Sequence, residues 1–387
     1  MENLNFGSIL LFYGFADKMK KTTGQKEGIH VMKTNNLIDL DQLSHEEVQE
    51  LITLAGNIRK NPAWYMDACH GKIMATLFYE PSTRTQMSFQ AAMLRLGGKI
   101  IGFDNPGNSS VSKGESLKDT VRIVSNYSDI IVIRNPREGA ALAASLYSRV
   151  PVISAGDGGH LHPTQTLTDL VTLSYEKGRL TNLTIGLCGD MKNGRTVHSL
   201  IKCLSRYEGN RFVLISTPQL QIPQYIRDVL HASGCPYTCL NSLEEAIPEL
   251  DVLYMTRIQQ ERFASREEYE KQKGVYVLDK DKLRGAKRDL CILHPLPRVD
   301  EITVDVDDDP RAKYFEQGEY GMYARMALIL EMLKKKSGEV PPKVHSTHTA
   351  CCQNPRCITQ TEGYLPHLFR EGGGMLVCQY CDERNLI

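Results

Sequence analysis

The stretch Ser82–Thr85 (sequence Ser-Thr-Arg-Thr) brings together side chains that can bind an anion. The apolar segment 72–79 precedes it through Pro81, which predicts a strand that leads into the first turn of a helix. The free N–H groups of such a turn, which hydroxyls can also cap, bind phosphate or carboxylate oxygens, and Arg84 adds a planar pair of donors. The alternative is a capped helix start with a solvated arginine, because short motifs also match by chance.

Five of the eleven cysteines lie in the C-terminal 37 residues. Four residues separate Cys352 from Cys357, and two separate Cys378 from Cys381. This spacing is typical of a structural four-thiolate zinc site, and so small a domain would fold only with its metal. A redox Cys-x-x-Cys is the alternative, but no βαβ pattern surrounds Cys378. Stand-in ligands nearby are Cys351, His345, His348 and His367.

Composition limits the function classes. A chain of 387 residues with 41% hydrophobic content can bury a large core and should form two or three domains. Lys+Arg and Asp+Glu are equal at 46 each, so no positive field favours nucleic acid or a membrane surface. No apolar stretch approaches the length of a membrane span, and the short run Ile9–Tyr13 does not resemble a secretory signal. We therefore expect a cytoplasmic protein with reduced cysteines.

Alternating strands and helices must position the candidate residues. A capping box at Ser44 predicts a helix start, and helical periodicity predicts another helix at 314–333. A buried strand at 129–134 ends in Arg134, at the strand edge where open α/β sheets bind ligands. Further predicted strands are 99–103, 151–155, 183–188, 211–215 and 252–254.

The Ser-x-Arg-Thr turn followed by an aromatic-containing helix resembles the carbamoyl-phosphate motif of the aspartate and ornithine transcarbamoylases. From about residue 32 to about 335 the chain is similar to aspartate carbamoyltransferase catalytic chains. The resemblance implies two doubly wound α/β parallel-sheet domains, for carbamoyl phosphate and aspartate, beside a small β-rich zinc domain. The implied division is a leader at 1–31, a carbamoyl-phosphate domain at 32–165 completed by a helix at 314–335, an aspartate domain at 166–313, a linker at 336–346 and a zinc domain at 347–387.

The leader matches nothing we can assign. We expect it to be disordered. The alternatives are that translation starts at Met32 and the upstream start was assigned in error, or that the leader is an added interaction segment.

The resemblance implies a site for each substrate. The residues implied for carbamoyl phosphate are Ser82, Thr83, Arg84, Thr85, Ser110, Lys113, Arg134, His162 and Gln165. Those implied for L-aspartate are Lys113, Arg195, Arg257, Gln259 and Leu296. Arg84, Thr85, Arg134 and His162 are implied as the catalytic donors to the carbonyl oxygen. His160, two residues before His162, falls on no motif position.

Arg195 and Arg257 offer two guanidinium groups, and each can bind one carboxylate through a pair of hydrogen bonds. A dicarboxylic amino acid is therefore favoured as the acceptor. At the position where this chain has Pro-Leu-Pro (295–297), ornithine enzymes have a sequence similar to His-Cys-Leu-Pro. We therefore expect carbamoyl phosphate and L-aspartate to give N-carbamoyl-L-aspartate in pyrimidine biosynthesis, with no cofactor for catalysis. The alternatives are a transcarbamoylase with another acceptor and a catalytically inactive partner that uses its zinc domain to bind a protein.

The family also implies a homotrimer whose loop 105–115 (Gly/Ser/Pro-rich, with Ser110 and Lys113) reaches a neighbouring active site. The C-terminal cysteine segments resemble the zinc domain of the family's regulatory chain, without its nucleotide-binding effector domain. We expect this domain to pack on its own or a neighbouring catalytic domain, to support assembly and to give no nucleotide control. The usual ion pair of the motif helix is replaced by Gln86 and Gln90, which suggests an amide pair.

Overall fold

The computed structural model describes residues 32, 34–260, 263, 265–335, 338–339, 341–372 and 374–386. The predicted leader at 1–31 lies outside these residues. Within the described part of the chain, no helix is both long enough and apolar enough to cross a membrane.

The first sheet consists of four parallel strands in the order β2-β1-β3-β4. Its strands are β1 (Ile73–Phe78), β2 (Lys99–Phe103), β3 (Ile130–Asn135) and β4 (Val152–Asp157). The helices between and around them are α2 (His45–Lys60), α3 (Thr83–Arg95), α4 (Leu117–Val124) and α5 (Ala140–Ser145). The inner strands are almost wholly buried, as expected for parallel strands covered on both faces.

The second sheet has five parallel strands in the order β7-β6-β5-β8-β9. Its strands are β5 (Thr184–Cys188), β6 (Arg211–Ile215), β7 (Tyr237–Leu240), β8 (Val252–Met255) and β9 (Cys291–Leu293). Its helices are α7 (Arg195–Leu204), α8 (Gln224–Ala232), α9 (Leu243–Ala246) and α10 (Arg266–Gln272). The predicted strands at 183–188, 211–215 and 252–254 are thus confirmed to within a residue.

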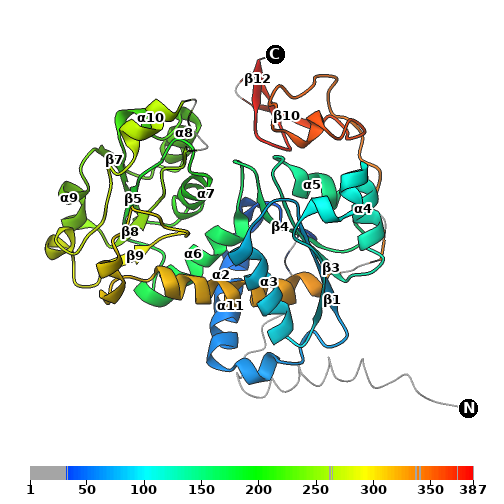
Figure 1. Cartoon of the computed structure of the whole chain (residues 1–387), viewed down its shortest axis with the longest axis horizontal. Helices are drawn as coiled ribbons and strands as arrows, with labels where there is room; N and C mark the ends of the chain where they lie inside the picture. Colours follow the sequence, from blue (N-terminus) through cyan, green and yellow to red (C-terminus); the bar gives the residue numbers. More distant parts are fainter. Residues whose placement is uncertain are drawn as a thin grey trace, which may run out of the picture. The chain divides into compact units, whose positions relative to one another are not determined.

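Two long helices lie between the sheets. Helix α6 (Pro163–Lys177) follows β4, and α11 (Tyr314–Leu333) packs against α6, α2 and α3 (Figure 1). The predicted helix at 314–333 and its return to the first group of helices are therefore confirmed. The predicted domain limit at residue 165 falls within the first turn of α6.

The C-terminal segment forms a three-stranded antiparallel sheet, β10-β11-β12. Its strands are β10 (Phe369–Gly372), β11 (Met375–Cys378) and β12 (Arg384–Leu386). We call the described residues of 347–386 the Cys module. Its apolar side chains join the core of the first sheet and its helices, and the fold class of two parallel-sheet α/β domains with a β-rich appendage is confirmed.

Local signals at two helices can be compared with the structure. The capping box is present, since Ser44 Oγ accepts from the Glu47 amide and Glu47 Oε2 accepts from the Ser44 amide. The predicted pairing of Gln86 with Gln90 is wrong, because Gln90 Nε2 donates to Thr76 Oγ1 of β1 at 3.3 Å. The sequence spacing gave no sign that the strand beneath α3 offers an acceptor.

Candidate active site and metal site

The predicted substrate-binding residues gather at the C-terminal ends of parallel strands, where open α/β sheets form their ligand crevice. Those from the first sheet follow or end β1, β3 and β4, and are Ser82, Thr83, Arg84, Thr85, Arg134, His162 and Gln165. Those from the second sheet follow β5, β8 and β9, and are Arg195, Arg257, Gln259 and Leu296.

Helix α3 begins at the predicted anion motif. Ser82 is its N-cap residue, but the Ser82 side chain makes no capping hydrogen bond, contrary to the expectation that the hydroxyl caps the turn. The amide N–H groups of the first turn can therefore serve an anion instead. Burial, and then the charge of Arg257, lower the pKa of Arg84, so the guanidinium from the second sheet lies close enough to influence the one from the first.

Arg134 is held in place at the end of β3. Its Nε pairs with Glu80 Oε1 at 2.8 Å, and its Nη1 donates to the Ala155 carbonyl at 3.2 Å. The same Nη1 lies 3.4 Å from His162 Nε2. Burial lowers the pKa of Arg134, and Glu80 opposes this effect. The side chain is thus a fixed cation beside the histidine.

His162 is the N-cap residue of α6, makes no side-chain capping hydrogen bond and is 6% exposed. Burial lowers its pKa well below the ordinary value, and the charges of Arg195, Arg134 and Arg325 lower it further. The imidazole is therefore neutral near pH 7. A neutral ring surrounded by guanidinium groups can donate a hydrogen bond to a substrate oxygen without adding a further full charge.

Gln165 belongs to a buried network. Its Nε2 donates to Asp169 Oδ1 at 2.8 Å, and the same oxygen accepts from Gln317 Nε2 of α11 at 2.6 Å. Asp169 Oδ2 accepts from Tyr254 OH of β8 at 3.0 Å. Burial raises the pKa of Asp169 to about 7 although these three donors lower it. The network fixes Gln165 from both sheets.

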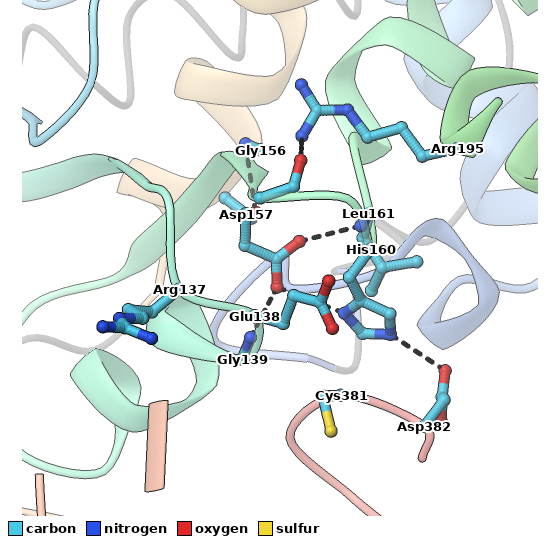
Figure 2. A network of polar contacts seen from close by, with 12 residues as sticks. Arg137, Glu138, Gly139, Gly156, Asp157, His160, Leu161, Arg195, Cys381 and Asp382 are labelled. Atoms are coloured by element: carbon cyan, nitrogen blue, oxygen red, sulfur yellow. Dashed lines mark hydrogen bonds and ion pairs between the residues drawn. The ribbon is translucent and has the colours of Figure 1, made fainter. Parts of the chain in front are cut away.

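Arg195 reaches from α7 to the turn that follows β4. Its Nη1 donates to the Gly158 carbonyl (Figure 2). In the same turn, burial lowers the pKa of His160, but hydrogen bonds to Asp157 and Asp382 outweigh it and raise the pKa to about 10. Arg195 therefore contacts the same short turn of backbone that leads directly into His162.

Arg257, Gln259 and Leu296 are half-buried in the turns after β8 and β9. The Leu296 amide donates to His294 Nδ1 at 2.8 Å, and His294 Nε2 pairs with Glu301 Oε1 at 2.8 Å. These contacts fix the turn that carries Leu296.

The loop 105–115 contains two short 3-10 turns, Pro106–Asn108 and Ser110–Lys113. The hydroxyl groups of Ser109 and Ser112 donate to backbone carbonyls of the loop itself, at 2.8 Å each. Ser110 and Lys113 are exposed. Ser112 is exposed as well, so the choice of Ser110 as the serine that the loop presents stays a prediction.

Three charged residues near the site had not been singled out from the sequence, namely the half-buried Glu80 and the buried Asp169 and Arg325. Arg325 is 5% exposed, donates from Nη1 to Ser88 Oγ at 3.1 Å and lies over the Phe89 ring. A charge within the otherwise apolar run 324–330 of this helix was the one signal available for it.

The four predicted metal ligands are brought together. Cys352, Cys357, Cys378 and Cys381 are buried, and their Sγ atoms all lie within 4.8 Å of one another. Zn–S bonds of about 2.3 Å in a tetrahedron would place the sulfurs about 3.8 Å apart. The cluster fits such an ion, and the exposed Cys351 lies outside it.

Two family models match the chain. The carbamoyl-phosphate-binding domain of aspartate/ornithine carbamoyltransferases matches residues 35–175, and the aspartate/ornithine-binding domain matches residues 181–332. Both matches end before the Cys module.

Individual relatives agree. The aspartate carbamoyltransferase catalytic subunit of Clostridium novyi (strain NT) is 58% identical over 303 residues, covering 78% of this chain and 99% of the relative. The crystallised catalytic subunit of M. jannaschii aspartate transcarbamoylase is 46% identical with a TM-score of 0.73, covering 78% and 98%. Trypanosoma cruzi aspartate transcarbamoylase with carbamoyl phosphate and aspartate is 38% identical with a TM-score of 0.73, covering 78% and 97%. The chain therefore belongs to the aspartate/ornithine carbamoyltransferase family and is a carbamoyltransferase.

Proposed function

We propose that this enzyme transfers the carbamoyl group of carbamoyl phosphate to the α-amino group of L-aspartate, giving N-carbamoyl-L-aspartate and phosphate. The observation that carries this assignment is the placement of Arg84 after β1 of the first sheet and of Arg195 and Arg257 after β5 and β8 of the second, at the C-terminal ends of parallel strands. Guanidinium groups at the strand ends of both sheets suit two anionic substrates, a phosphate ester and a dicarboxylate. The reaction is an early step of pyrimidine biosynthesis, for which we propose a cytoplasmic location that suits four reduced thiols.

The first sheet would bind carbamoyl phosphate. The phosphate would be held by Ser82, Thr83, Arg84, Thr85 and Arg134, with Ser110 and Lys113 of a neighbouring subunit. Gln165 would hold the carbamoyl group. Arg84, Thr85, Arg134 and His162 would donate to the oxygen that becomes anionic in the tetrahedral intermediate.

Preorganisation of these donors supports the catalytic assignment. Arg134 is fixed by contacts within the protein, to Glu80 and to the Ala155 carbonyl. Oriented donors of this kind lower the barrier by about 3 kcal/mol each. The departing phosphate would take the amine proton, so the scheme needs no metal or organic cofactor for catalysis. Closeness and orientation of the two substrates supply the rest.

The second sheet would bind L-aspartate. Arg195 would bind the α-carboxylate, and Arg257 with Gln259 the side-chain carboxylate. Lys113 and Leu296 would complete the pocket. An ornithine site would instead require neutral or anionic groups around an ammonium.

An acceptor assay tests the assignment. We expect carbamoylation of L-aspartate and none of ornithine or N-acetylornithine. Arg257→Ala should raise the KM for aspartate by about 100-fold, because a bidentate carboxylate contact is lost. Arg266→Ala, in the exposed first turn of α10, is the matched control and should behave as the parent. Preference for ornithine would overturn the choice of acceptor.

We also propose a homotrimer with shared active sites, supported by the exposure of Ser110 and Lys113. The Cys module would hold a structural Zn²⁺ through Cys352, Cys357, Cys378 and Cys381, and could support a higher assembly. Light scattering and zinc quantification on the purified chain test both proposals. CTP or ATP should leave the aspartate saturation curve unchanged, because the short segment 336–346 before the Cys module leaves no room there for a nucleotide-binding effector domain.

A further inference from the structure

One side-chain pair joins the Cys module to the turn between β4 and α6. His160 Nε2 lies 3.1 Å from Asp382 Oδ2, and the His160 side chain is 12% exposed (Figure 2). His160 falls on no motif position of the family pattern. The family pattern therefore assigns no role to His160, and its role must be inferred from its contacts in this chain.

The other ring nitrogen of His160 faces the active-site turn. Its Nδ1 lies 3.2 Å from Asp157 Oδ2, and that oxygen also accepts from the Gly139 amide at 2.7 Å. Asp157 Oδ1 accepts from the Leu161 amide at 2.8 Å, so the carboxylate spans the turn from one end to the other. His162 is the next residue along the chain.

The same turn also receives Arg195, through the Gly158 carbonyl. A displacement of residues 157–161 would therefore move His162, which faces the carbamoyl group in the proposed function, and Arg195, which faces the α-carboxylate. Small displacements of such groups are costly, because catalysis depends on near-attack geometry.

Asp382 is fixed on the other side by the cysteine turn. It directly follows Cys381, its backbone has a left-handed φ of 59°, and its amide donates to the Cys378 carbonyl at 2.9 Å. Asp382 Oδ1 accepts from Arg370 Nη2 at 3.0 Å. The position of this carboxylate thus depends on how Cys378 and Cys381 are held.

The module is seated firmly on the same edge of the first sheet. The Glu138 amide donates to the Arg356 carbonyl at 3.0 Å, and the Ile358 amide donates to the Glu138 carbonyl at 2.9 Å. Tyr380 packs so closely on Gly139 that an added Cβ there would lie 2.5 Å from the Tyr380 Cβ. The module therefore docks on its own chain, and the His160–Asp382 pair is part of a closely packed junction.

We propose that His160 is a positioning residue through which the Cys module holds the turn 157–162, so that metal binding by the module sets the affinity of the active site in the same chain. The inference rests on the proposed roles of His162 and Arg195 and on the proposed metal. The competing reading is that His160 only fills space beneath the module.

Asp382→Ala in the full chain separates the two readings. We expect zinc content to stay at the parent value and the chain to stay folded while the KM for carbamoyl phosphate rises about tenfold. Binding of N-(phosphonacetyl)-L-aspartate, measured by calorimetry, should weaken similarly, and the Leu161 amide should exchange hydrogen faster. Asp382→Asn keeps an acceptor oxygen and should retain most of the affinity. Arg384→Gln, an exposed cation on the same module, should change nothing.

Metal removal supplies the second arm. Chelation of zinc from the parent protein should reproduce the loss of affinity. Chelation of zinc from Asp382→Ala should lower the affinity little further, because both changes disrupt the same contact between the module and the turn. If Asp382→Ala loses its zinc, His160→Gln, which lies outside the module, should show the same rise in KM. Unchanged KM and unchanged exchange at Leu161 in these variants would overturn the proposal. A parent chain without zinc would overturn the metal link alone, and the Asp382 variants would still decide the role of His160.

Discussion

The edge of the first sheet and the Cys module are in contact at Glu138, but different interactions stabilise the two regions. Strands β1 and β3 are buried along nearly their whole length, whereas β10 is exposed at all but its first residue. The sheet is stabilised by apolar burial, and the module depends on four thiols and on a neighbouring surface. The predicted substrate-binding residues therefore lie on a scaffold stabilised by apolar burial, while the module would need the proposed metal to complete its thiol cluster.

The module is also energetically incomplete without the first sheet. Its apolar residues form one cluster with α4, α5 and the sheet rather than a core of their own. The contributing side chains of the module include Ile358, Leu365, Leu368, Phe369, Leu376 and Tyr380. Disrupting the cysteine cluster and disrupting the contact with the first sheet should thus both destabilise the module, the first change more than the second.

The largest effect should come from the metal site. Cys357→Ser removes a fully buried ligand, and apparent zinc affinities in small domains correspond to about 10 kcal/mol. Zinc content should fall from about one ion per chain to almost none, with proteolysis confined to the module. Cys351→Ser, at the exposed neighbouring cysteine, should keep its zinc. Collapse of the whole chain in Cys357→Ser would contradict the separation of the two regions.

Arg84→Ala should abolish catalysis without affecting the fold. Loss of one preorganised donor costs about 3 to 4 kcal/mol of transition-state stabilisation, so kcat should fall by at least 100-fold. Arg84 is exposed, and the melting temperature should change little. Arg95→Ala, at the other end of α3, is the matched control for steady-state kinetics. Parent activity in Arg84→Ala would remove this residue from the site.

Glu138→Ala should loosen the junction between the two regions. Asn354 Nδ2 would lose its acceptor, now 2.6 Å away, and a buried unsatisfied donor costs about 2 kcal/mol. Faster hydrogen exchange at the Ile358 amide is the measurement. Arg356→Gln should cost less than about 1 kcal/mol, because the Arg356 side chain is 65% exposed. Equal effects of the two variants would argue against a buried junction.

The smallest effect is a change in pH dependence at Asp169. Burial raises its pKa to about 7, so the folded state keeps a proton that the unfolded state releases above about pH 4. Stability should therefore decline as the pH rises through this range and level off above about 7. Asp169→Asn should remove up to about 1.4 kcal/mol per pH unit of this slope in urea unfolding. Asp289→Asn, whose parent carboxyl has a lowered pKa, should leave the slope unchanged, and a parent-like slope in Asp169→Asn would refute the prediction.

Local patterns predicted much of the structure. The α3 start, the strands, the capping box at Ser44 and the four clustered cysteines all follow from spacing within a few residues. The contacts that tune the site could not be predicted in this way. Glu80 beside Arg134, Gln317 beside Asp169 and Asp382 beside His160 are pairs from distant parts of the chain, and only the fold brings them together. The error at Gln90 has the same cause, since its partner lies on another element.

The covalent attachment of the Cys module has a consequence for how the enzyme behaves on dilution. A partner supplied as a separate polypeptide dissociates once its concentration falls below its Kd, whereas a tethered one experiences an effective concentration of about a millimolar set by the short linker. Every copy of the catalytic edge thus carries its own module in one-to-one ratio. Occupancy of the junction is decided by intramolecular equilibrium and is independent of how much protein the cell makes.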